Sequence, residues 1–212
     1  MNIESIIARK LIQLKAFSIQ TTHPIQWGNG WKAPVYLDDR KLLSYTQARA
    51  FFKVELSRLA AENFPDVDIV AGVATTAIAH GVIVAEQLGL PFVYVHPTPK
   101  DHGLENQIEG DLRPRQKVLI VENQVNTGNN LIKVIEAIRN NGCTVVGVVT
   151  LFDYLFPMAK KKLSVAGVPL FALCNFDAFM EQIRLDKQYS EEVLSVLEDW
   201  HNNPKKWRPY HE

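Results

Sequence analysis

The amino-acid sequence predicts an α/β protein with a doubly wound, mostly parallel sheet. Short apolar runs such as DIVAGVA, PFVYVH, KVLIV and TVVGVVTLF alternate with stretches of helical periodicity, as is typical of parallel strands joined by crossover helices. The chain has 212 residues, which suits one domain better than two full ones. Its 47% hydrophobic and 22% charged fractions match an ordinary globular protein with a packed core.

Composition excludes several classes of function. Lys plus Arg and Asp plus Glu both count 23, so no bulk positive field favours nucleic acid and any anion site must be local. The two cysteines, Cys143 and Cys174, lie in apolar surroundings without metal-ligand spacing. We expect reduced core thiols there, and the sequence predicts no metal-ligating set of side chains.

The N-terminal residues 1–17 lack the continuous apolar core of a signal peptide, because charged residues interrupt them. No stretch approaches the roughly 18 uninterrupted apolar residues of a membrane-spanning helix. We therefore expect a cytoplasmic protein without a membrane partner.

The elements follow in order along the chain. Apolar residues recur at helical spacing over 3–16, which predicts an amphipathic helix. Residues 21–39 are rich in Pro, Gly and Trp and indicate short strands and turns. A second helix is predicted over 44–63, ended by Pro65. We expect residues 1–43 to form this first helix and a small N-terminal hood of a single domain.

The predicted α/β core covers residues 44–175. It contains four strands (DIVAGVA, PFVYVH, KVLIV and TVVGVVTLF), a helix over AIAHGVIVAEQLG and another from near Leu131 to about Asn141. Residues 176–212 show helical periodicity and then a polar, aromatic-dotted tail. We expect C-terminal helices with a tied-down tail.

The segment KVLIVENQVNTGNN, residues 117–130, is the first candidate site. In parallel sheets ligands bind beyond the carboxyl ends of the strands, so a strand ending at Val121 would present Glu122 and Asn123 there. The turn 126–130 leads into a helix, whose free N–H groups and positive end suit a phosphate, with Gly128 permitting close approach. This pattern alone also occurs in α/β proteins that bind no ligand.

The stretch VLIVENQVNTG resembles the phosphoribosyl pyrophosphate signature of type I phosphoribosyltransferases. Three further segments are similar to orotate phosphoribosyltransferases in particular, and they come in the family's order: GWKAPVYLDDR, IVAGVATTAIAHG and KDHGLENQIEG. The resemblance spans roughly residues 5 to 180. It implies a type I phosphoribosyltransferase-like fold with a small hood and a mobile lid loop.

The resemblance also implies an activity. Ribose 5-phosphate would pass from phosphoribosyl pyrophosphate to N1 of orotate, in the presence of Mg²⁺, as a step of pyrimidine biosynthesis. In this family the lid reaches the neighbouring subunit's site, which implies a homodimer. The substrates would be the protein's partners.

The resemblance assigns roles to residues of each segment. A phosphate cradle would consist of Asn126, Thr127, Gly128, Asn129 and Asn130. Glu122 and Asn123 would face the sugar hydroxyls. The loop after Val73 and the residue after Val95 would hold pyrophosphate through Ala74, Thr75, Thr76 and His96.

Two more segments have a structural and a functional interpretation. The polar stretch 99–110 is either a solvated loop or a lid whose cations Lys100 and His102 meet the leaving group. The segment 30–40 either only packs a hood or binds the base. In the second case Lys32, Tyr36 and the planar guanidinium of Arg40 would contact orotate.

Several positions depart from the family's pattern. Asn123 replaces a second acid, Thr76 and Ala77 stand where glycines are usual, and His96 and Pro97 stand where cations are usual. Loss of one charge-assisted hydrogen bond costs on the order of 1 kcal/mol. The departures together would cost about 4 kcal/mol, or about a thousandfold in rate.

Two other functions therefore stay open. One is a weakly active or non-catalytic homologue that binds a nucleotide or phosphoribosyl compound, and the other is a phosphoribosyltransferase for another base. A dinucleotide-binding domain is disfavoured, because no G-x-G-x-x-G follows any of the strands.

Overall fold

The computed structural model describes residues 2–99 and 107–209. These residues form two compact units. The core unit comprises the described part of Tyr45–Asn175, and the terminal unit comprises residues 2–44 and 176–209. Each unit is described separately.

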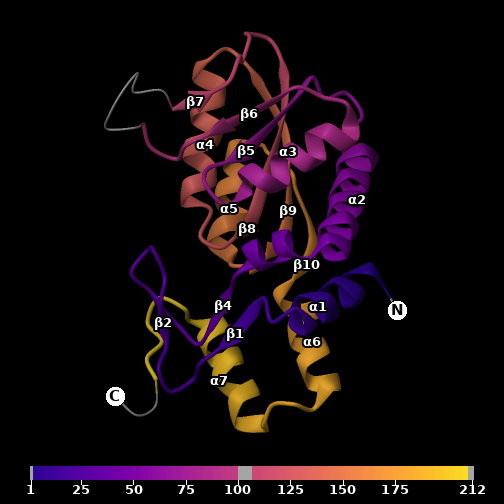
Figure 1. Ribbon diagram of the computed structural model, residues 1–212. Helices are drawn as coiled ribbons and strands as arrows, with labels where there is room; N and C mark the ends of the chain where they lie inside the picture. The colour runs from indigo at the N-terminus through magenta and orange to yellow at the C-terminus, as the bar shows by residue number, and fades with distance from the viewer. Residues whose placement is uncertain (1, 100–106, 210–212) are drawn as a thin grey trace. The chain divides into compact units, whose positions relative to one another are not determined.

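A six-stranded sheet forms the centre of the core unit, with the strand order β10-β9-β8-β5-β6-β7 (Figure 1). All neighbouring strands are parallel except β6 and β7. The predicted α/β class with a mostly parallel sheet is therefore confirmed. The strands are β5 (Ile69–Val73), β6 (Phe92–Val95), β7 (Ile108–Glu109), β8 (Lys117–Val125), β9 (Thr144–Asp153) and β10 (Leu170–Asn175).

Helices cover both faces of this sheet (Figure 1). On one face α2 packs against α3, and on the other α4 packs against α5. Their bounds are α2 (Thr46–Asn63), α3 (Ala77–Leu88), α4 (Asn129–Asn140) and α5 (Pro157–Ala166). In α4 the buried residues Leu131, Val134, Ile135 and Ile138 recur at helical spacing and join the core. Because helices cover both faces, β5 is buried at every residue, which explains its continuous apolar run.

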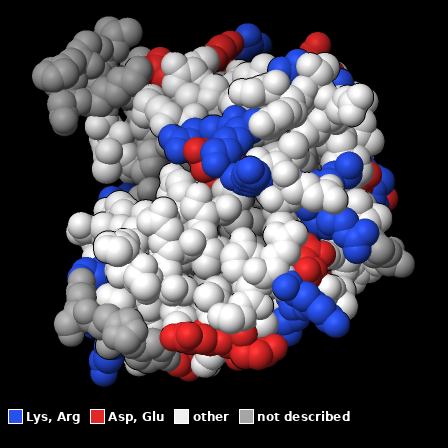
Figure 2. Space-filling view, turned by 60° about the horizontal axis from the view of Figure 1, so that its bottom comes forward, with Lys and Arg blue, Asp and Glu red and all other residues white. Residues whose placement is uncertain are grey.

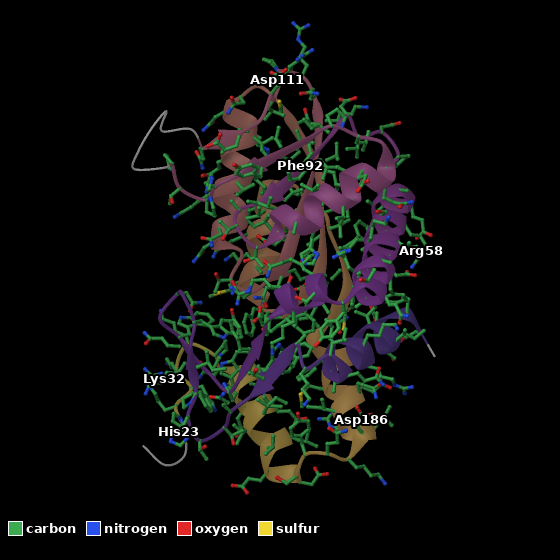
Figure 3. The ribbon with its side chains drawn as sticks, viewed as in Figure 1. His23, Lys32, Arg58, Phe92, Asp111 and Asp186 are labelled. Atoms are coloured by element: carbon green, nitrogen blue, oxygen red, sulfur yellow. The ribbon has the colours of Figure 1, made fainter. Side chains whose placement is uncertain are left out.

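Two glycines bring α3 close to β5. A Cβ atom at Gly81 would lie 2.6 Å from the Phe92 ring and 3.1 Å from the Cα atom of Gly72. A Cβ atom at Gly72 would lie 3.0 Å from the same ring (Phe92 is labelled in Figure 3). The ring of Phe92 therefore occupies the space that two side chains would fill. This packing fixes the start of α3 at the carboxyl end of β5.

In its described residues, the terminal unit combines three α-helices and a 3₁₀ helix with two small antiparallel sheets. Strand β1 pairs with β4, and β2 pairs with β3. Helix α1 packs against α6, and Trp200 of α7 is fully buried with its ring edge-on to Trp27 at 5.3 Å. The elements are α1 (Ile3–Gln13), β1 (Phe17–Ile19), β2 (Ile25–Gln26), β3 (Lys32–Ala33), β4 (Val35–Leu37), the 3₁₀ helix η1 (Asp39–Ser44), α6 (Phe176–Asp186) and α7 (Glu191–Asn202).

The structure corrects several predicted boundaries. The first helix ends at Gln13, because Lys15 adopts a left-handed conformation with φ of 52°. Strand β8 continues to Val125 instead of ending at Val121, and α4 begins at Asn129 instead of near Leu131. Strands β1, β7 and β10 and helix α5 were not predicted from the sequence.

The distribution of charge agrees with the equal counts of basic and acidic residues. On the face shown in Figure 2, Lys and Arg side chains lie in separate groups, some mixed with Asp and Glu, between areas without charge. In the described part of the chain, no helix has the length and apolar character needed to cross a membrane.

Candidate active site

The candidate site lies where the order of strands reverses. From β5 the chain proceeds to β6 on one side, whereas β8, β9 and β10 extend the sheet on the other side. In open α/β sheets ligands bind at such a switch point, outside the carboxyl ends of the two strands. Two of the segments that the sequence singled out, those after Val73 and after Val121, flank this point.

The two strands part at Glu122. The pairing of β5 with β8 runs from Ile69–Val118 to Gly72–Val121 and then stops. Beyond this point β8 continues beside β9 alone, with Glu122 opposite Thr150 and Val125 opposite Asp153. The extension of β8 to Val125 supports the candidate site. The polar residues after Val121 pair with β9 on one side, and no described strand pairs with them on the other side.

Glu122 and Asn123 lie at this opening. Their residues are only 8% and 9% exposed. A carboxylate oxygen of Glu122 accepts a hydrogen bond of 2.9 Å from the backbone N–H of Asn123. The backbone of β8 thus holds the acid and the amide in place, at the point where the pairing of β5 with β8 stops.

The turn after β8 contains the residues predicted for the phosphate cradle. The N–H of Thr127 donates to Oδ1 of Asn126 at 2.5 Å, and Thr127 is 5% exposed. Gly128 has a φ of 72°, a conformation that favours glycine, and is the N-cap of α4. No side chain caps this helix end, so its first N–H groups face the turn. Because α4 begins at Asn129, Asn129 and Asn130 belong to its first turn.

The loop after β5 connects directly to α3. The N–H of Ala74 donates to the carbonyl of Val95 at 2.9 Å, the peptide bond between Ala74 and Thr75 is cis, and Thr76 precedes the helix. Ala77, one of the departures from glycine, is fully buried and belongs to the core. Its methyl group therefore packs inside the core. Thr75 is exposed.

His96 follows β6 and is hydrogen-bonded to Gln107, near the far end of the predicted lid. Its N–H donates to the carbonyl of Gln107 at 2.8 Å, and the Gln107 side-chain amide donates back to the carbonyl of His96 at 3.0 Å. The imidazole ring packs edge-on against Tyr94. Its Nε2 atom is buried and makes no hydrogen bond within the described part of the chain.

The end of the predicted lid is a strand. Ile108 and Glu109 form β7, which pairs antiparallel with Val95 and Tyr94 of β6. A two-residue strand is too short to give an alternating pattern, so residues 99–110 were predicted as loop throughout. The predicted cations Lys100 and His102 lie outside the described residues.

The residues predicted for the base lie in the terminal unit. Arg40 donates from Nε to Asp38 at 2.6 Å and from a terminal nitrogen to the Tyr36 hydroxyl at 3.4 Å. The hydrogen bond and charge of Asp38 raise the pKa of Arg40 above its usual value. Lys32 lies on β3, in the other small sheet (Figure 3). Tyr36 and Arg40 are thus in contact, and Lys32 is on a separate hairpin.

The sequence did not predict that Lys162 contacts the turn at residues 126–130. The ammonium of Lys162, in α5, donates to the carbonyl of Thr127 at 2.9 Å and to Oδ1 of Asn129. No sequence signal singles it out, because it belongs to a run of three lysines whose other members, Lys160 and Lys161, are exposed. Only the placement of α5 beside the cradle distinguishes them.

The site offers few groups for a metal ion. In residues 2–99 and 107–209 no group of three or more His, Cys, Asp and Glu side chains could hold one. The oxygen atoms of Glu122 and Asn123 nevertheless fit Mg²⁺, which usually binds one or two carboxylates and completes its shell with water and substrate phosphates.

Comparisons with known proteins agree with this architecture. The family model described as "Phosphoribosyl transferase domain" matches residues 44–185. The chain is 47% identical to the orotate phosphoribosyltransferase of Bacteroides thetaiotaomicron over 206 residues, or 97% of each chain. It is also 47% identical to that of Porphyromonas gingivalis over 95% of this chain and 96% of the relative. The crystal structure of orotate phosphoribosyltransferase from Aeropyrum pernix matches with a TM-score of 0.74 and 28% identity, over 84% of this chain and 98% of that one.

Proposed function

Because the chain belongs to the phosphoribosyltransferase family, and within it to the orotate phosphoribosyltransferases, we propose that it transfers ribose 5-phosphate from phosphoribosyl pyrophosphate to N1 of orotate. The products are orotidine 5′-phosphate and pyrophosphate. The observation that carries this proposal within the structure is the cradle of Thr127 and Gly128 beside Glu122, at the switch point between β5 and β8.

The reaction breaks the bond between C1′ of the sugar and pyrophosphate and forms a bond from C1′ to N1 of orotate. It asks for little proton transfer by the protein, so most of the rate enhancement comes from positioning and electrostatics. The cradle residues 126–130 hold the 5′-phosphate through backbone N–H groups. The carboxylate of Glu122 and the amide oxygen of Asn123 accept hydrogen bonds from the sugar hydroxyls, and the negative charge of Glu122 stabilises positive charge at C1′.

The remaining substrate groups have candidate partners. The loop residues Ala74, Thr75 and Thr76, with His96, bind pyrophosphate. Lys100 and His102 supply positive charge to the leaving group from the lid. Mg²⁺, when bound, neutralises charge on the phosphates. Lys32, Tyr36 and Arg40 bind the base, with the guanidinium oriented by Asp38.

At the level of the whole chain, we propose a single phosphoribosyltransferase domain that works as a homodimer in the cytoplasm. Its parts are the N-terminal helix and hood (1–43), the α/β core (44–175) and the C-terminal helices and tail (176–212). The family membership supports this proposal.

The test is turnover by the purified protein. Orotate, phosphoribosyl pyrophosphate and Mg²⁺ are mixed with the enzyme, and loss of orotate is followed by ultraviolet absorbance. We expect turnover with orotate and none when uracil or adenine replaces it. Turnover only with another base would assign the chain to that base. Binding of phosphoribosyl pyrophosphate without turnover on any base would indicate a non-catalytic homologue.

A further inference from the structure

We propose that Lys162 is a positioning residue for the 5′-phosphate cradle. Its hydrogen bonds stabilise the conformation of the turn, and its ammonium adds positive charge on the side that faces α5. This inference rests on the proposed function, since it takes the cradle to be the phosphate site. Lys162 lies 35 residues beyond Thr127 in the chain. It belongs to α5, which lies outside the four segments that carry the resemblance in the sequence.

Helix α5 lies directly against the turn. A Cβ atom at Gly128 would come within 3.3 Å of the Cα atom and 3.4 Å of the Cβ atom of Ala159. Ala159 is 2% exposed, and Lys162 follows it at a spacing of three residues, which puts both on one face of the helix. The close packing at Gly128 therefore brings the Lys162 ammonium to the turn.

The hydrogen bond to Thr127 orients a neighbouring donor. In a trans peptide the carbonyl and the following N–H point in opposite directions. Because the carbonyl of Thr127 faces Lys162, the N–H of Gly128 faces away from α5. A cation on the carbonyl oxygen also polarises the peptide and makes this N–H a stronger donor to an anion.

The hydrogen bond to Asn129 removes an acceptor from the anion site. Oδ1 of Asn129 carries partial negative charge and would repel a phosphate if it turned toward it. Lys162 binds this oxygen. Asn129 then contributes its backbone N–H, at the first position of α4, instead of its side-chain oxygen. The positive charge of Lys162 adds to that of the helix end.

This role makes a specific prediction about ligands. Lys162→Met should weaken binding of ribose 5-phosphate about tenfold, since hydrogen bonds to charged groups commonly contribute that much. Binding of pyrophosphate should stay within about twofold of wild type, because it uses the loop after β5. The KM for phosphoribosyl pyrophosphate should rise more than kcat falls. Isothermal titration with each ligand and steady-state kinetics measure these effects.

Two variants serve as controls. Lys161→Met removes a neighbouring exposed lysine from the same helix and should leave both affinities unchanged. Lys162→Arg keeps a cationic donor and should recover most of the lost affinity. Thermal denaturation of all three variants separates loss of the ligand contact from loss of the fold.

Two results would overturn the proposal. One is wild-type affinity of Lys162→Met for ribose 5-phosphate, and the other is an equal loss of affinity for ribose 5-phosphate and pyrophosphate, which would indicate a general structural defect. Failure of the proposed function would give a different result, because the wild-type protein would bind ribose 5-phosphate but transfer nothing to orotate. The affinities of the Lys162 variants for ribose 5-phosphate would still test this inference.

Discussion

At the scale of single residues, Asn123 is the substitution that bears most directly on catalysis. It lies beside Glu122 where β8 separates from β5, so its side chain adjoins the proposed sugar site. An amide oxygen accepts a hydrogen bond as a carboxylate does, but it carries no charge to stabilise positive character at C1′. The site keeps its geometry and loses part of its electrostatic contribution.

Asn123→Asp should therefore raise activity. We expect an increase in kcat of up to about tenfold at saturating Mg²⁺, because a charge-assisted hydrogen bond replaces a neutral one. Steady-state kinetics with orotate measure it. Asn140→Asp, an exposed position at the end of α4, is the matched control and should not change kcat. An unchanged or lower kcat for Asn123→Asp would mean that repulsion from Glu122 outweighs the gain.

The sequence predicted the position of the turn at Thr127 and Gly128 better than it predicted the residues that pack around this turn. Thr127 and Gly128 could be located because a strand, a polar turn and a helix start are all visible in a short window. The burial of Ala77 could not be predicted from the sequence, since it depends on how α3 packs. Lys162 could not be predicted, because its contact with Thr127 joins segments 35 residues apart.

At the scale of elements, the close approach of α3 to β5 determines where the loop proposed to bind pyrophosphate lies. Gly72 and Gly81 leave room for the ring of Phe92, which holds the helix near the strand. The loop at 74–76 joins the two elements, so its position follows from this packing.

Gly81→Ala should destabilise the protein. The new methyl group would lie 2.6 Å from the Phe92 ring and 3.1 Å from the backbone of Gly72, and overpacking outweighs the gain in helix propensity. We expect the free energy of unfolding to fall by about 1–2 kcal/mol. Urea denaturation measures it. Gly28→Ala is the control, because a Cβ atom added there would have no neighbour within 4 Å among the described residues. Equal stability of the two variants would contradict the proposed packing of Gly81 against Phe92.

Strands with continuous apolar runs were predicted from the sequence, whereas β7, α5 and β10 were not. Strands β5, β6, β8 and β9 carry continuous apolar runs because helices bury both faces, and these runs were recognised. Strand β7 has only two residues, and its strand conformation depends on antiparallel pairing with β6. The end of β8 was misplaced, because the polar residues after Val121 resemble a loop while β9 still pairs with them.

At the scale of the whole molecule, the balance of charge agrees with an enzyme that acts on small molecules. With 23 basic and 23 acidic residues, a substrate carrying several phosphates must be attracted locally, by helix ends and individual cations. The described cations that meet this need include Lys162 at the cradle. The core unit holds the cradle and the loop after β5, whereas the residues proposed for the base belong to the terminal unit.

The central claim is that the turn at Thr127 and Gly128 binds the terminal phosphate of a phosphoribosyl compound. A crystal structure of the protein grown with ribose 5-phosphate tests it most directly. The account predicts the phosphate within hydrogen-bonding distance of the backbone N–H groups of Gly128 and Asn129, with the sugar beside Glu122. A ligand bound elsewhere in the molecule, with this turn left empty, would contradict it.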